Sequence, residues 1–382
     1  MNGFIDKARL SETGPKRTAL VVLNFGGPLS AAEVEPFLYE LFDDPDVIQL
    51  RPAALRRQLA RTISHRRAPK VIPQYEAIGF SPIVPTTEKQ IAALAEALGP
   101  SGPKIYRGMR YTAPTIESMV KEIARDKPDR LVALSLYPHY SGSTTGSSFN
   151  AFSSAMKDAG LGRLPVRYVP AFYDHPRYLA ALRDRIDSAI KKVANPDQAH
   201  LIFSAHGLPS SYYQGGDPYP TQVQETVRLV MRELPWKGSY GLAFQSKVGP
   251  VRWLEPSTEQ EIHRVAALGI KEVIVVPIAF VSDHIETLYE IDVTFAEFAA
   301  SHGSKLVRTE ALNLHPEFIG CLADVVRGAL ADDTYQGIGE HHCVRCLLPR
   351  PHEHRMRSQC LDCGHKTPEY LLRLPPVKES KR

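Results

Sequence analysis

Long apolar runs alternate along the chain with segments in which apolar residues recur every three or four positions. Nearly continuous apolar runs predict parallel strands covered on both faces. We expect such strands at 19–23, 104–109, 131–136, 166–169, 200–203, 240–244 and 272–278. The amphipathic segments predict helices at 87–98, 116–126, 178–194, 219–233 and 257–268, with a last helix near 315–331. This alternation is typical of an α/β doubly wound fold.

The two halves of the sequence resemble each other. Residues 25–28 and 206–209 both leave a predicted strand through a Gly-x-Pro turn. Farther on, 131–138 leads into a polar loop, as 273–279 does in the second half. We therefore predict two similar Rossmann-like domains with parallel sheets facing a central cleft. Phe25 then holds the place in the first half that His206 holds in the second.

These patterns divide the chain into five parts. The length of 382 residues suits two domains with ample core. We expect an N-terminal tail (1–17), a first α/β domain (18–171), a second α/β domain (172–312), a helix that packs back on the first domain (313–339) and a Cys-rich tail (340–382). Cys321 falls on the apolar side of the last helix and is expected to be a buried structural thiol.

Composition and charge narrow the function classes. Apolar residues make up 43% and charged residues 23%, which is ordinary for a soluble protein, and the net charge of +4 is too small to favour nucleic acid as a partner. Residues 1–17 lack the apolar core of a signal peptide, and Pro277 breaks the longest apolar run. We therefore expect a cytoplasmic protein, a monomer or a homodimer. Motifs of serine hydrolases, P-loop enzymes and dinucleotide-binding enzymes are absent from the sequence.

Histidine and carboxylates follow two of the predicted strands. His206 comes just after one, and Asp283, Glu286 and Glu290 come after another, together with His284. If Asp283 caps a helix, the three acids share one helix face. Asp283 and Glu286 also fit a simple capping box. Because parallel strands place chemistry at their carboxyl ends, we predict a site there that handles protons and a metal ion.

A basic segment precedes this pattern in the first half. Residues 47–75 contain seven Lys or Arg and no acid, with Leu50, Leu55, Leu59 and Ile63 interleaved. The basic residues are Arg51, Arg56, Arg57, Arg61, Arg66, Arg67 and Lys70. One interpretation is a solvated basic helix packed on its own domain. The other is a lip, spanning 47–83, that contacts an anionic membrane surface as a peripheral protein.

The tail carries two CxxC pairs. Cys343 and Cys346 are followed by Cys360 and Cys363, a spacing that predicts four thiolates around a metal. Four cysteines suit structural zinc or a 2Fe-2S cluster, so the spacing alone leaves both open.

Several motifs, in order, resemble the ferrochelatases. The resemblance runs from about residue 19 to 313. It is carried by residues 23–28, 74–75, 81–83, 137–150, 204–209, 216–220, 245–250, 253 and 276–290.

The resemblance implies an enzyme, a lyase that inserts ferrous iron into protoporphyrin IX in haem biosynthesis. It implies that His206 and Glu286 handle the substrate iron and the protons. Asp283, His284 and Glu290 would form an associated acidic path. The residues implied to bind porphyrin are Phe25, Arg110 and Tyr111 on the opposite face, Arg67, Tyr75 and Ser81 at the mouth, and Tyr137, Ser246 and Trp253 along the walls.

The resemblance also helps to choose between zinc and a 2Fe-2S cluster in the tail, and between related activities. Some ferrochelatases carry a C-terminal 2Fe-2S cluster, which favours the cluster over zinc. In the animal pattern one ligand comes from the position of Gly142, so all four ligands here would come from the tail. Coproporphyrin or cobalt chelation is a related alternative activity. A non-enzymatic two-lobed metal or haem carrier, and a zinc-ribbon nucleic-acid module, are alternatives of other classes.

Overall fold

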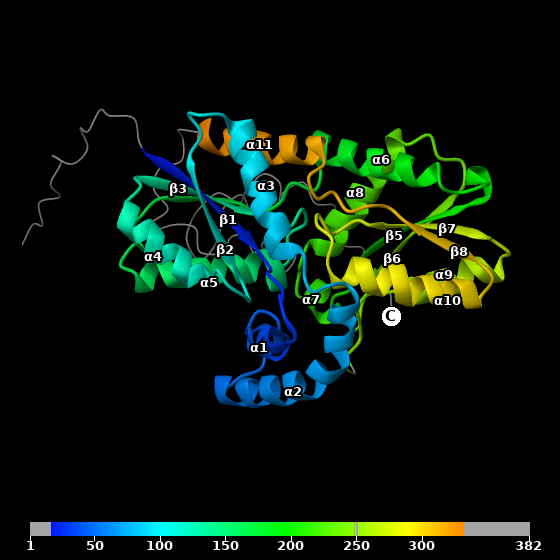
Figure 1. Ribbon diagram of the computed structural model, residues 1–382, viewed down its shortest axis with the longest axis horizontal. Helices are drawn as coiled ribbons and strands as arrows, with labels where there is room; N and C mark the ends of the chain where they lie inside the picture. The colour runs from blue at the N-terminus through cyan, green and yellow to red at the C-terminus, as the bar shows by residue number, and fades with distance from the viewer. Residues whose placement is uncertain (1–16, 248, 250, 332–382) are drawn as a thin grey trace, which may run out of the picture.

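Two four-stranded parallel sheets form the frame of the protein (Figure 1). The computed structural model describes residues 17–247, 249 and 251–331. The strand orders are β2-β1-β3-β4 and β6-β5-β7-β8, so one topology occurs twice. The strands are β1 (Thr18–Asn24), β2 (Lys104–Met109), β3 (Arg130–Ser135), β4 (Val166–Val169), β5 (His200–His206), β6 (Ser239–Gln245), β7 (Glu272–Pro277) and β8 (Lys305–Arg308). The predicted pair of doubly wound domains is confirmed.

Helices connect the strands and cover the sheets. The α-helices are α1 (Ala31–Phe42), α2 (Ala53–Ala77), α3 (Ile83–Leu98), α4 (Ile116–Asp126), α5 (Ser147–Asp158), α6 (Pro176–Ile190), α7 (Ser210–Gln214), α8 (Tyr219–Glu233), α9 (Thr258–Ala267), α10 (Ala296–Ser301) and α11 (Pro316–Ala331). A 3-10 helix, η3 (Pro196–Gln198), and two π-helices, η2 (Gly142–Gly146) and η4 (Glu286–Phe295), complete the set. Among the described residues, no helix is long and apolar enough to cross a bilayer.

Alternation along β1 explains why this strand lies at the centre of its sheet. Leu20 and Val22 face the core beneath α3 and α11, whereas Val21 and Leu23 face α4 and α5. Successive side chains of a strand point to opposite faces, so a strand covered on both sides is apolar throughout. Each fully buried aliphatic side chain of this kind contributes about 1.5–3 kcal/mol.

One core joins the two halves. The cluster that contains Leu20 and Val22 continues to Leu201 and Phe203 of β5 and includes residues of α6, α8 and α11. Helix α11 packs against α3 and α6, so it contacts elements of both halves (Figure 1). The relative position of the two sheets is therefore set by close packing rather than by a linker.

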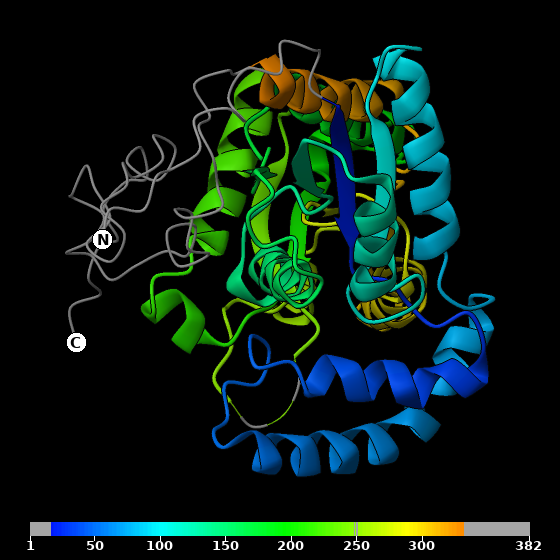
Figure 2. The same ribbon diagram turned by 90° about the vertical axis from the view of Figure 1, so that its left-hand side faces the viewer.

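Helices α1 and α2 pack against each other beyond the sheets, below them in Figure 2. Helix α1 buries Val34, Phe37, Leu38 and Phe42, at the spacing that places residues on one helix face. The basic segment of the sequence forms α2, in which Leu55 and Leu59 remain 51% and 39% exposed.

Strand β8 is not among the predicted strands. It has only four residues, begins with a Lys and ends with an Arg, and lies at the edge of its sheet. Edge strands are often short and charged, which prevents pairing with other chains and removes the apolar run that would mark them. The Cys343, Cys346, Cys360 and Cys363 prediction, with the rest of the Cys-rich tail, lies outside the described residues.

Candidate active site

His206 and Glu286 meet where two neighbouring strands end. His206 is the last residue of β5, and Glu286 is the first residue of π-helix η4, which follows β7. Strands β5 and β7 pair in parallel, so their carboxyl ends share one edge of the sheet. The His206 Nδ1 and Glu286 Oε2 atoms lie 2.8 Å apart. Because a carboxylate only accepts, Nδ1 carries the proton of this bond and Nε2 is left as the basic nitrogen.

The pair perturbs the titration of both groups. Burial lowers the pKa of His206, but the charge and hydrogen bond of Glu286, with the charge of Glu290, outweigh burial and raise this pKa above its ordinary value. Burial raises the pKa of Glu286, yet the charges and hydrogen bonds of His206 and His284 lower it well below its ordinary value. The interaction thus favours an imidazolium beside a carboxylate. The His206 side chain keeps 37% of its surface exposed.

Glu290 lies four residues after Glu286 on η4 and has its own partners. Its carboxylate accepts hydrogen bonds from the Ser246 hydroxyl (2.5 Å), the Ser246 N–H (3.1 Å) and Gln245 Nε2 (3.2 Å). Burial and the charge of Glu286 raise the pKa of Glu290 above its ordinary value, although these hydrogen bonds act in the opposite direction. Ser246 holds a positive φ of 66°, which turns its N–H and hydroxyl toward the same carboxylate.

His284 lies beside the pair. Its Nδ1 donates to the Ser282 carbonyl at 3.2 Å, and its Nε2 lies 3.8 Å from Glu286 Oε2. Phe280 packs against the ring at a centroid distance of 4.4 Å. His206, His284, Glu286 and Glu290 are thus brought together, although no group of three or more metal-binding side chains is found among the described residues.

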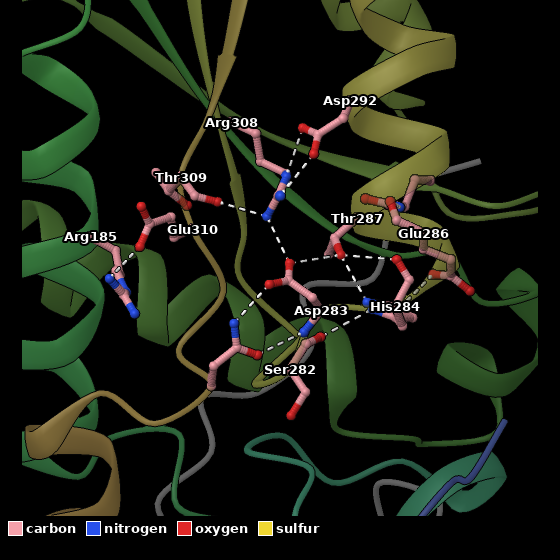
Figure 3. A network of polar contacts seen from close by, with 12 residues as sticks. Arg185, Ser282, Asp283, His284, Glu286, Thr287, Asp292, Arg308, Thr309 and Glu310 are labelled. Carbon is pink, nitrogen blue, oxygen red and sulfur yellow. Dashed lines mark hydrogen bonds and ion pairs between the residues drawn. The ribbon is translucent and has the colours of Figure 1, made fainter. Parts of the chain in front are cut away.

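Asp283 does not share a helix face with the other acids, contrary to expectation. It precedes η4, and its carboxylate accepts from Arg308 Nη1 (3.0 Å), Asn313 Nδ2 (2.7 Å) and the Thr287 hydroxyl (3.1 Å) (Figure 3). These three bonds tie the carboxylate to the end of β8, to the segment that follows it and to the first turn of η4. The predicted α-helical register fails here because the chain enters a π-helix only at Glu286.

Phe25, Arg110 and Tyr111 form a second cluster in the first half. The rings of Phe25 and Tyr111 meet edge to face at 4.7 Å, and the Arg110 guanidinium lies 4.8 Å from the Tyr111 ring centroid. Asp44 connects the cluster through hydrogen bonds. Its buried carboxylate accepts from Arg110 Nη2 (2.7 Å), the Tyr111 hydroxyl (2.6 Å) and the Ser147 hydroxyl. Burial and the Asp44 charge raise the pKa of Tyr111.

Sequence reasoning missed Asp44 and Ser147. Asp44 belongs to an acidic run before a basic helix, a context that usually indicates solvated charges. Its side chain is nevertheless fully buried. The signal that could have found it is the need of a partly buried Arg110 for an anion.

The residues expected at the entrance of the porphyrin site, Arg67, Tyr75 and Ser81, belong to α2 or follow it closely. Tyr75 is 5% exposed, and burial with the charge of Glu286 raises its pKa. Tyr75 belongs to an apolar cluster that also contains Phe25, Tyr111 and, from the second half, Ile285. Side chains of both halves therefore meet beside Glu286.

The other predicted contacts are more dispersed. Arg67 lies 6.0 Å from the Phe42 ring centroid, and burial lowers its pKa. Ser81 is buried so closely against Gly27 that a Cβ on that glycine would lie 2.1 Å from the Ser81 hydroxyl.

Tyr137 and Trp253 are partly buried. Burial raises the pKa of Tyr137, whose ring lies near Ser148. Trp253 packs on the turn after His206, where a Cβ on Gly207 would lie 3.3 Å from the indole.

Comparison with known proteins accords with this geometry. The ferrochelatase family model matches residues 17–330. The ferrochelatase of Geotalea uraniireducens (strain Rf4) is 47% identical over 321 residues, which cover 84% of this chain and 100% of that protein. The ferrochelatase of Synechocystis sp. (strain ATCC 27184 / PCC 6803 / Kazusa) is 46% identical over 323 residues, 83% of each chain.

Among solved structures, SirB from Bacillus subtilis with Fe3+ is similar in fold. It has a TM-score of 0.52 at 13% identity, with 84% of this chain and 98% of that chain covered. The family match spans both sheets and the site at the ends of β5 and β7. The chain belongs to the ferrochelatase family.

Proposed function

We propose that the protein inserts ferrous iron into protoporphyrin IX with His206 as the proton acceptor. The reaction exchanges two pyrrole protons for one ferrous ion and leaves the oxidation state of the iron unchanged. Each proton needs a base that is available near neutral pH. The observation that carries the proposal is the 2.8 Å contact between His206 and Glu286 in a chain of this family.

The pair suits this task electrostatically. The Glu286 carboxylate stabilises the imidazolium that forms when His206 accepts a proton, so His206 is a stronger base than an isolated histidine. Glu290 lies next on η4, and its raised pKa makes it a suitable second acceptor. With His284 beside Glu286, these groups form the proposed path for protons and for the entering iron. Asp283 belongs to another network.

Porphyrin would lie between this site and the first-half cluster. The partly buried Phe25, backed by the buried Tyr111 and Tyr75, offers aromatic surface close to Ile285 and therefore to Glu286. Binding contacts of this kind can distort a flat macrocycle and expose its nitrogen lone pairs. Ser246 and Trp253 flank the second-half side, and Arg67 supplies a cation for carboxylate groups of the substrate, whereas Arg110 is paired with Asp44.

The assay that tests this proposal uses purified protein, ferrous iron under anaerobic conditions, and either protoporphyrin IX or coproporphyrin. Formation of the metalloporphyrin is followed by absorbance. We expect turnover with protoporphyrin. Turnover with coproporphyrin alone would assign the related activity, and absence of both products would refute the proposal.

We further propose that α2 is a membrane-contacting lip. Its exposed Leu55 and Leu59 are one helical turn apart among seven basic residues. Arg56 and Arg57 pair with Asp43 and contribute less to the attraction than the unpaired charges. Sedimentation with anionic vesicles at low salt should capture the protein, and the Leu55→Ser/Leu59→Ser variant should bind less. Equal binding of neutral and anionic vesicles would contradict the lip.

For the tail we propose a 2Fe-2S cluster held by Cys343, Cys346, Cys360 and Cys363. The proposal rests on their spacing and on the resemblance, because these residues lie outside the described part of the chain. Visible absorption of aerobically purified protein, with iron and sulfide analysis, tests it. Colourless protein that contains zinc would assign the alternative.

A further inference from the structure

A network of charged residues surrounds the turn that leads into η4 (Figure 3). Residues 278–285 join β7 to η4, and side-chain contacts add to the few backbone hydrogen bonds that hold this connection. Asp283 and Asn313 make a reciprocal pair: the Asp283 N–H donates to Asn313 Oδ1 at 3.0 Å, and Asn313 Nδ2 donates to Asp283 Oδ2 at 2.7 Å. The other carboxylate oxygen of Asp283 accepts from Arg308 Nη1 at 3.0 Å.

Arg308 serves two carboxylates at once. Its Nε and Nη2 donate to the two oxygens of Asp292, each at 2.8 Å, in the bidentate geometry that the planar guanidinium favours. Its Nη1 reaches Asp283 and also the Thr309 carbonyl. The Arg308 side chain is 10% exposed, and those of Asp283 and Asp292 are 21% and 37% exposed. Asp292 lies on η4 itself, so Arg308 ties the helix to the turn before it.

The network reaches the candidate active site through Thr287. The buried Thr287 hydroxyl accepts from the His284 N–H at 3.0 Å, and its single proton has two acceptors within reach, Asp283 Oδ1 at 3.1 Å and the His284 carbonyl at 3.0 Å. It therefore transmits the position of Asp283 to the backbone of His284. Two residues farther on, Glu286 makes its 2.8 Å contact with His206.

We infer that Arg308 is a positioning residue for iron insertion, acting through Asp283 and Thr287 on His284 and Glu286. The inference rests on the proposed function. In this role Asp283 is a brace whose charge is neutralised by Arg308. It is not a member of the proton path, because all three of its side-chain partners lie in the brace and not at the His206–Glu286 pair.

The charges make a distinctive prediction about paired substitutions. Arg308→Gln leaves the partly buried Asp283 and the exposed Asp292 without their shared cation, and the loss is costly mainly at Asp283. Asp283→Asn keeps one oxygen acceptor for Arg308 and Thr287, loses the bond that Asn313 Nδ2 donates to the second oxygen, and leaves Arg308 paired with Asp292. Adding Asp283→Asn to Arg308→Gln removes one of the two orphaned charges. The double variant should therefore perform better than Arg308→Gln alone, a coupling that only interacting residues show.

The experiment measures kcat, KM for protoporphyrin and thermal unfolding for the wild type, these three variants and Arg308→Lys. We expect Arg308→Gln to lose about tenfold or more in kcat with KM changed less than about twofold, because the affected groups act at the reaction centre. Asp283→Asn should lose about threefold or less, and its pH profile should keep its position. Arg308→Lys should recover part of the loss, since it restores the charge without the bidentate geometry.

Glu310→Gln is the matched control. Glu310 follows the same strand, and its carboxylate pairs with Arg185 at 2.6 Å without touching Asp283 or Thr287 (Figure 3). Its side chain is 61% exposed, so we expect unchanged kcat and nearly unchanged stability.

Two results would overturn the inference. If Asp283→Asn is as inactive as Arg308→Gln and the double variant recovers no activity, Asp283 acts as a proton carrier. Lower stability of Arg308→Gln with unchanged kcat would make the network purely structural. Wild-type turnover separates this inference from the proposed function: an inactive wild type refutes the function, whereas contrary variants of an active enzyme refute only the role of Arg308.

Discussion

Glu286→Gln should change both the acid limb and the plateau of the pH profile of kcat/KM, because it removes the charge that stabilises protonated His206. The substitution keeps the shape of the side chain and removes the anion beside His206. A hydrogen bond to a charged group contributes about 1.5–3 kcal/mol. Because the His206 side chain is 37% exposed, solvent weakens the interaction, and we adopt about 1.4 kcal/mol, equivalent to about tenfold in a rate constant.

The sign follows from the raised pKa of His206. Below that pKa the imidazole is protonated and cannot accept a pyrrole proton, so kcat/KM falls on the acid side. Without the Glu286 charge, the imidazolium loses its proton more easily. The acid limb should therefore move to lower pH. The plateau should fall by about tenfold, because His206 becomes a weaker base and the imidazolium is less stabilised.

The assay is a pH profile of kcat/KM for protoporphyrin with ferrous iron held constant. Glu290→Gln is the matched control, since the charge of Glu290 is a smaller cause of the raised pKa of His206 and makes no hydrogen bond to it. It should move the limb in the same direction by less. An acid limb that stays in place or moves to higher pH in Glu286→Gln would refute the reasoning.

Two further predictions concern the partners of the site. Asp44→Asn should lower the free energy of unfolding by about 3 kcal/mol, since it removes the buried anion beside the partly buried Arg110; urea denaturation measures this, and an unchanged midpoint would contradict it. Ser246→Ala removes the shortest hydrogen bond to Glu290, so the pKa of Glu290 should rise further and the acid limb of kcat should move to higher pH. A limb that moves to lower pH would show that Ser246 does not stabilise the carboxylate.

The sequence predicted best where burial dictates residue type. The apolar runs of β1, β5 and β7 marked the strands, because a central parallel strand tolerates few polar side chains. The same runs located His206 and Glu286, since a site at adjacent strand ends follows from the topology. The amphipathic periods of α4 and α8 gave their bounds for the same reason.

Prediction failed where long-range polar contacts decide the conformation. Arg308 and Asn313 fix Asp283, yet they lie 25 and 30 residues from it and belong to no motif. Asp44 is buried only because Arg110 and Tyr111, more than 60 residues away, need an acceptor. The π-helical entry at Glu286 likewise has no period that a short sequence window reveals.

Single-turnover iron insertion by His206→Ala, with bound protoporphyrin followed by fluorescence, tests the central claim most directly. We expect this variant to bind protoporphyrin with nearly wild-type affinity, because the Phe25 and Tyr111 cluster is unchanged. It should form no haem on the wild-type timescale, because the proton acceptor is missing. Haem formation at the wild-type rate by the porphyrin-loaded variant would contradict the account.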